Sequence, residues 1–96
     1  MAGQTEERKV AGAKMLTLNA TTIETSGIFS PRARAVTVVT SADAYIAFDT
    51  TATTGDPSIL LLVGEELEIR DCDFTTFHAI TAAGTATVRC AYSYVI

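Results

Sequence analysis

The sequence predicts an all-β chain that folds as a small jelly-roll-like β-sandwich or barrel of about six to eight short antiparallel strands. Three observations lead to this fold class. Threonine and other β-branched residues dominate the chain, which disfavours helices and favours strands. No window from Met15 onward keeps apolar residues at helical spacing for three turns. Turn-forming residues recur about every 8 to 12 residues, a spacing typical of sandwiches and barrels.

The chain of 96 residues has room for one domain. We expect a single β-domain over residues 15–96, preceded by an amino-terminal arm over residues 1–14. So short a domain buries only about 60 to 65% of the surface of its unfolded chain, so we expect neighbouring subunits to add burial. The arm is polar, and two interpretations are open. It is either a disordered, flexible terminus or an arm that orders on a partner.

The last strand, over residues 85–96, is the clearest. Every second residue of an extended strand faces the same side, and here one side is apolar or aromatic throughout: Ala86, Val88, Cys90, Tyr92 and Tyr94. A strand over residues 75–81 precedes the short turn 82–84, so the two strands are predicted to form a hairpin.

A second hairpin is predicted from strands over residues 34–40 and 44–49, because the small and polar residues between them suit a turn. Residues 50–57 are then predicted to form a surface loop, since Gly55, Asp56 and Pro57 are three consecutive residues that favour turns.

Three further strands complete the prediction. Residues 58–63 are predicted as a buried strand, and residues 65–70 as a strand with Leu67 and Ile69 inward. A candidate strand over residues 20–25 is an edge or crossing segment, because Pro31 beyond it cannot occupy a central ladder position.

Charge and hydropathy exclude several classes of function. The formal net charge is −4 and the pI is about 4.7, so neither a nucleic acid nor an anionic membrane is an expected partner. The longest apolar run, residues 59–63, is far shorter than the roughly 20 residues of a membrane-spanning helix. The polar start lacks the pattern of a secretory signal, so the chain is expected to be made in a cytoplasm.

Catalytic chemistry has little support in the sequence. The chain has one histidine, His78, which alternates with Phe77 and is expected at a surface or an interface. The acidic residues lack the ligand spacing of a calcium loop, and no glycine-rich loop precedes a helix. Cys72 and Cys90 are expected to be two buried thiols, with pairing left open. We therefore predict no enzyme activity, no small-molecule substrate, no cofactor and no metal, and no catalytic residue.

Arg32 and Arg34 lie two residues apart at the entry to a strand, and hence on one face if the backbone is extended there. They either anchor an acidic partner surface or are solvated.

Residues 35–94 resemble small β-structured virion accessory proteins of tailed bacteriophages. The resemblance rests on the order of strands and loops: the strand 44–49, the Thr/Ala/Gly loop 50–57, the Leu-Leu-Leu-Val-Gly run 60–64, the strand 65–69 and the hairpin 77–88. It covers roughly two thirds of the chain and includes no catalytic signature.

The resemblance implies a capsid decoration (cement) protein on the virion surface, commonly a homotrimer that clamps the major capsid protein. The partner-binding residues predicted on this basis are Arg8, Lys9, Lys14, Arg32 and Arg34. The alternative is a tail or fibre-adaptor β-domain that contacts another tail protein or a host receptor. The Thr50–Pro57 loop has no aromatic side chain for reading a receptor, which favours the decoration role.

Overall fold

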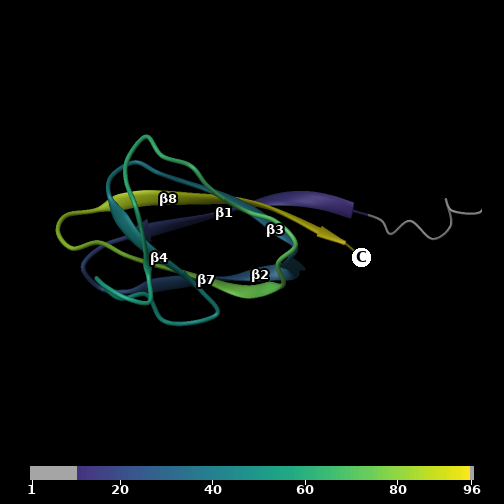
Figure 1. Cartoon of the computed structure of the whole chain (residues 1–96), viewed down its shortest axis with the longest axis horizontal. Helices are drawn as coiled ribbons and strands as arrows, with labels where there is room; N and C mark the ends of the chain where they lie inside the picture. Colours follow the sequence, from purple (N-terminus) through teal and green to yellow (C-terminus); the bar gives the residue numbers. More distant parts are fainter. Residues whose placement is uncertain (1–10, 96) are drawn as a thin grey trace, which may run out of the picture.

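Two four-stranded antiparallel sheets pack face to face in the computed structural model, which describes residues 11–95 (Figure 1). The first sheet has the strand order β1-β8-β3-β6, and the second has the order β2-β7-β4-β5. This confirms the predicted all-β sandwich. The strands are β1 (Ala11–Ala20), β2 (Thr25–Ala33), β3 (Ala35–Thr40), β4 (Ala44–Phe48), β5 (Ile59–Leu61), β6 (Leu67–Ile69), β7 (Phe74–Ile80) and β8 (Ala86–Val95).

The connections between strands define a jelly roll. Of the seven links between successive described strands, only the one from β4 to β5 stays within a sheet. Both predicted hairpins are therefore wrong, because β3 and β4 lie in different sheets, and so do β7 and β8. A short turn between two alternating strands can close a hairpin or cross to the opposite sheet. Either path leaves the same residues facing the core, so alternation alone does not distinguish them.

The amino-terminal part of the domain also differs from the prediction. β1 begins at Ala11, so residues 11–14 belong to the sandwich, whereas residues 1–10 of the predicted arm lie outside the described part. The predicted strand over residues 20–25 is the turn between β1 and β2. There the backbone N–H of Ile23 donates to the Thr21 hydroxyl over 3.1 Å, and the Ile23 side chain is 77% exposed. Threonine favours strands, but here the local hydrogen bond to the Thr21 hydroxyl stabilises a turn instead.

The core lies between the sheets and is filled by the inward faces of all the longer strands. In β8 the inward residues are the ones that alternation predicts. Four phenylalanines and Tyr92 form its aromatic part, in which the Phe48 and Phe74 ring centroids are 4.4 Å apart and those of Phe29 and Tyr92 are 4.7 Å apart. The largest fully buried side chains are Phe77, Ile46, Val36, Val38, Val88, Thr81 and Cys90.

The outer faces of the two sheets are not equivalent. Ala47 points away from the core by alternation with Ile46, yet it is buried. The loop between β4 and β5 provides the cover, because its residue Ala52 is also buried and is hydrogen-bonded to Glu24. The outer face of the first sheet has no such cover among the described residues.

Two predictions concern strands that lie at the edges of the second sheet. The expected exclusion of Pro31 from a central strand is confirmed, and the expected burial of residues 58–63 is not. β2, which contains Pro31, is an outer strand of the second sheet with an irregular register between Ile28 and Ala33. The predicted buried strand over residues 58–63 is the short edge strand β5, in which only Leu61 is buried. An edge strand at one face of a core can bury only alternate residues, so its apolar neighbours stay in water.

Candidate functional site

Three of the five predicted partner-binding residues lie at one end of the sandwich. Lys14 is opposite Tyr92 in the β1–β8 ladder, and the backbone N–H of Arg34 donates to the Ser93 carbonyl over 2.8 Å. Arg32 lies just before this point, at the end of β2. The fold therefore gathers these cations beside the carboxyl end of β8. The other two, Arg8 and Lys9, lie outside the described residues.

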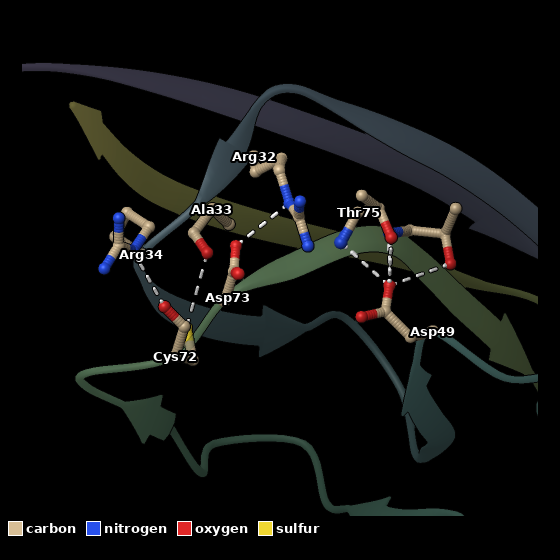
Figure 2. Close-up of polar contacts among 8 residues, drawn as sticks. Arg32, Ala33, Arg34, Asp49, Cys72, Asp73 and Thr75 are labelled. Atoms are coloured by element: carbon tan, nitrogen blue, oxygen red, sulfur yellow. Dashed lines mark hydrogen bonds and ion pairs between the residues drawn. The ribbon is translucent and has the colours of Figure 1, made fainter. Parts of the chain in front are cut away.

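The side chains of these cations are bonded to their own chain. Figure 2 shows Arg32 above Asp73, with Nε 3.0 Å from the Asp73 carboxylate, and Arg34 directed to the Cys72 carbonyl, to which its Nε donates over 3.1 Å. Lys14 Nζ donates to the Ser30 carbonyl over 2.7 Å. Because the Arg32–Asp73 pair is largely exposed, it contributes at most about 1 kcal/mol to stability.

His78 has a charged partner that the sequence analysis missed. Its Nδ1 lies 2.6 Å from Glu24 Oε2, and its Nε2 lies 2.9 Å from the Thr76 hydroxyl. Glu24 Oε2 also accepts a hydrogen bond from the backbone N–H of Ala52. The side chains of His78 and Glu24 are only 16% and 25% exposed. Since 54 residues separate the two, no local pattern in the sequence could have paired them.

The order carboxylate, imidazole, hydroxyl in Glu24, His78 and Thr76 is that of a catalytic triad. A nucleophile, however, needs a hydroxyl that can reach a substrate. The Thr76 hydroxyl is bonded on two sides, because Asp49 Oδ1 also lies 3.3 Å from it. The arrangement instead joins the β1–β2 turn and the β4–β5 loop to β7, and we call it the Glu24–His78 clamp.

Asp49 follows β4 in a left-handed conformation, with φ at 58°, and holds the start of the β4–β5 loop. Figure 2 shows its carboxylate directed to the start of β7. Its Oδ1 accepts bonds of 2.8 Å from the backbone N–H groups of Thr75 and Thr76 and from the Thr75 hydroxyl. The slight desolvation of this exposed carboxylate raises the pKa of Asp49, but the hydrogen bonds outweigh that effect and hold the pKa below the ordinary value of 3.8.

We expect Asp49→Ala to destabilise the domain by about 1 kcal/mol at neutral pH, a modest value because the carboxylate is exposed. A lowered folded-state pKa gives stability that is present above pH 3.8 and is lost as the pH falls through the folded pKa. Urea unfolding over a pH series should therefore show the two proteins converging in strong acid. Asp49→Asn keeps an acceptor oxygen and tolerates the left-handed backbone, so it is the matched control. A gap that persists unchanged in strong acid would exclude the carboxylate as its cause.

An exposed apolar segment lies at the opposite end of the sandwich from the cations. We call it the apolar turn; its exposed large side chains are Ile59, Leu60, Leu62 and Val63, of which Val63 is 58% exposed. Polar groups hold its backbone. Glu65 donates its N–H to the Leu62 carbonyl and accepts from the Leu62 N–H, both over 3.0 Å, and Asp43 accepts from the Val63 N–H over 2.9 Å. The turn thus presents its apolar side chains in a defined conformation.

The uncovered outer face of the first sheet contains a shallow groove of about 210 Å³, which we call the alanine groove. It follows rows of paired residues on β1, β8 and β3, in which Ala13 and Ala35 are both opposite Ser93. Small side chains create the hollow, and Met15, opposite Ala91 in β8, is exposed beside it. The groove is lined by Ala13, Ala35, Thr37, Ala91, Tyr92 and Ser93.

Both cysteines are free thiols, but only Cys90 is buried; Cys72, which was expected to be buried too, is partly exposed because it lies in the connection between β6 and β7. Burial raises the pKa of Cys90 to about 12. Burial also raises the pKa of Cys72, which is half-buried and donates to the Ala33 carbonyl over 3.7 Å. Both groups are therefore protonated at neutral pH, and thiols in that state are poor nucleophiles and metal ligands.

Within residues 11–95, no three His, Cys, Asp or Glu side chains are placed to hold a metal ion together. Over the same described residues there is no helix long and apolar enough to cross a membrane.

Comparison with known proteins adds one structural likeness. No protein-family model matches the chain, and no curated protein matches it. The chain is similar to a solved structure of Bacillus endospore appendages, which are described as a novel family of disulfide-linked pili, with a TM-score of 0.55 and 14% sequence identity. The likeness covers 93% of this chain and 91% of that one. At this identity it shows a shared fold.

Proposed function

We propose that the protein is a non-enzymatic structural subunit of a larger assembly, in which neighbouring subunits cover its exposed apolar side chains. One observation carries the proposal. Eight large apolar side chains are exposed within the 85 described residues, and four of them are close together in the apolar turn. Contiguous exposed apolar surface of this kind marks an interaction site more often than it marks a free surface.

The rigidity of the apolar turn supports this role. Asp43 and Glu65 use their carboxylates to accept hydrogen bonds from the backbone N–H groups of Val63 and Leu62, which restricts the backbone of the turn before any partner is bound. Order in advance of contact lowers the entropic cost of association. A turn built in this way suits a subunit that packs repeatedly against the same neighbour.

The similar pilus structure also supports an assembly role, because the same fold can serve as a fibre subunit. Those pili are described as disulfide-linked, but this chain has few cysteines with which to form disulfides between subunits. Its two cysteines are Cys72 and Cys90, and the second is fully buried. We propose that non-covalent packing of apolar side chains holds the assembly together.

Decoration of a phage capsid as a homotrimer is the second candidate role. The gathering of Lys14, Arg32 and Arg34 at one end of the sandwich favours it, since a cluster of cations can steer a subunit to an acidic shell. The resemblance described from the sequence suggests the same location on the virion surface. Contact with the major capsid protein stays a prediction.

Light scattering over a range of protein concentrations, with electron microscopy of the same samples, tests the assembly role. We expect the mass to rise with concentration and discrete rings or fibres to be visible. The double variant Leu62→Ser/Val63→Ser should reduce association at least tenfold, while Ile23→Ser, which removes a more exposed side chain outside the apolar turn, should not. A monomer at every concentration would contradict self-assembly. Cosedimentation of that monomer with undecorated capsids would then favour the decoration role.

A further inference from the structure

We propose that the Glu24–His78 clamp is a pH-sensitive switch that holds the β4–β5 loop. The hydroxyl of Thr76 couples the protonation state of His78 to Asp49, so the loop is held more tightly when the ring is doubly protonated than when it is neutral. Because the loop covers Ala47 on the outer face of the second sheet, the charge on one ring sets how firmly that face is covered. This inference does not depend on the proposed assembly role.

The hydrogen bonds of Glu24 identify the nitrogen of His78 that carries a proton in both states of the ring. An ionised carboxylate only accepts hydrogen bonds. Glu24 Oε2 accepts from the backbone N–H of Ala52 and lies 2.6 Å from His78 Nδ1. Two acceptors at that distance would repel each other, so Nδ1 is protonated and donates to Glu24. The neutral and the doubly protonated ring therefore differ only at Nε2.

The Thr76 hydroxyl has two neighbouring acceptors and one proton to donate. Its oxygen lies 2.9 Å from His78 Nε2 and 3.3 Å from Asp49 Oδ1. In the neutral ring, Nε2 accepts the hydroxyl proton, and Asp49 receives no bond from Thr76. In the doubly protonated ring, Nε2 donates to the hydroxyl oxygen, so the hydroxyl proton turns to Asp49. Protonation of His78 thus adds a donor to Asp49, and the same heavy-atom positions serve both states.

Both attachments of the β4–β5 loop depend on this ring. At the start of the loop, Asp49 Oδ1 accepts from two backbone N–H groups of β7 over 2.8 Å, and the Thr76 hydroxyl becomes a further donor when the ring is charged. Further along the loop, Ala52 is bonded to Glu24. The bond from His78 to Glu24 becomes charge-assisted when the ring is charged, which fixes the carboxylate that holds Ala52.

The groups that face His78 give the direction of the pH dependence. Ser26 of β2 and Ala47 of β4 are opposite His78 in the sheet and carry no charge. Glu24, from the β1–β2 turn, bonds the ring directly, and Asp49, from the β4–β5 loop, is linked to it through a hydroxyl of β7. Both carboxylates favour a positive ring when they are ionised. The closed loop therefore favours the protonated ring, and the loop opens more readily as the pH rises through the titration of His78.

Hydrogen exchange of backbone amides, measured by NMR over a pH series, tests the switch at both attachments. The amide of Ala52 reports on the bond to Glu24, and the two amides bonded to Asp49 report on the start of the loop. We expect the protection factors at both attachments to fall about fivefold over the pH range in which the ring signals of His78 show deprotonation. His78→Gln should show no such step. Protection factors that stay constant through the titration of His78 would overturn the switch.

Valine substitutions of two neighbouring threonines isolate the role of the Thr76 hydroxyl. Thr76→Val keeps the three other bonds of Asp49, so the step should disappear at the amides bonded to Asp49 and persist at Ala52. Thr75→Val is the matched control, because it removes a hydroxyl that bonds Asp49 and leaves the Thr76 hydroxyl between Asp49 and His78. It should lower protection at every pH and leave both steps in place. A step that survives at the Asp49 amides in Thr76→Val, or one that is lost in Thr75→Val, would overturn the coupling through Thr76.

Discussion

Replacing Phe77 with alanine is expected to lower the free energy of unfolding by about 3 to 5 kcal/mol, the range for removing a buried aromatic side chain. Phe77 is fully buried on β7, a central strand of the second sheet, and its ring stacks on Phe29 and Phe48 with centroid distances of 6.0 and 5.5 Å. Its removal deletes two aromatic contacts and leaves a cavity between the sheets. Urea denaturation followed by tyrosine fluorescence or circular dichroism measures the change.

Two variants serve as controls for this prediction. Phe77→Leu fills most of the volume and should cost clearly less. Phe74→Ala removes a ring of the same size that is only partly buried, so it should also cost less than Phe77→Ala. Equal losses at positions 74 and 77 would mean that burial is not what sets the contribution of these rings.

Replacing Glu24 with alanine is expected to lower the free energy of unfolding by about 2 kcal/mol. The change removes the acceptor for both His78 Nδ1 and the backbone N–H of Ala52, and these donors lie in a partly buried site. It should also loosen the β4–β5 loop over Ala47. Denaturation measures the first effect, and the rate of limited proteolysis within residues 49–58 measures the second.

A double-mutant cycle with Glu24→Ala and His78→Ala shows whether the two side chains act as one unit. We expect a coupling energy of about 1 kcal/mol or more, as found for directly bonded residues. Glu24→Gln keeps an acceptor oxygen and should recover part of the stability. Strictly additive losses, with unchanged proteolysis of the loop, would contradict the Glu24–His78 clamp.

Features that depend on neighbouring residues in the chain agree with the prediction, whereas features that depend on distant residues do not. β8 was predicted with its inward residues because alternation between Ala86 and Tyr94 repeats locally over the whole strand. Pro31 lies on an outer strand, which agrees with the expectation that a residue without an N–H cannot occupy a central ladder position. The exposed Glu68 and half-buried Leu67 and Ile69 on β6 follow from the same local rule.

The predictions of two hairpins and of a buried strand at residues 58–63 are wrong because residues far away in the chain decide strand pairing and burial. Turn residues 41–43 and 82–84 show that the chain reverses but not which sheet receives the next strand. The apolar run at residues 59–63 was expected to be buried because of its composition. Its exposure depends on β5 being the last strand of its sheet, which is set by how all eight strands are ordered.

By itself, the sequence determined the all-β class and the alternation of β8, because each depends on residue type and near neighbours. Only the tertiary structure decided the jelly-roll strand order, the pairing of Glu24 with His78, and the positions of the apolar turn and the alanine groove. The reason is that strand pairing and sheet packing join residues far apart in the chain. Backbone hydrogen bonds between strands are nearly independent of sequence, so the choice of neighbour comes from packing the whole core.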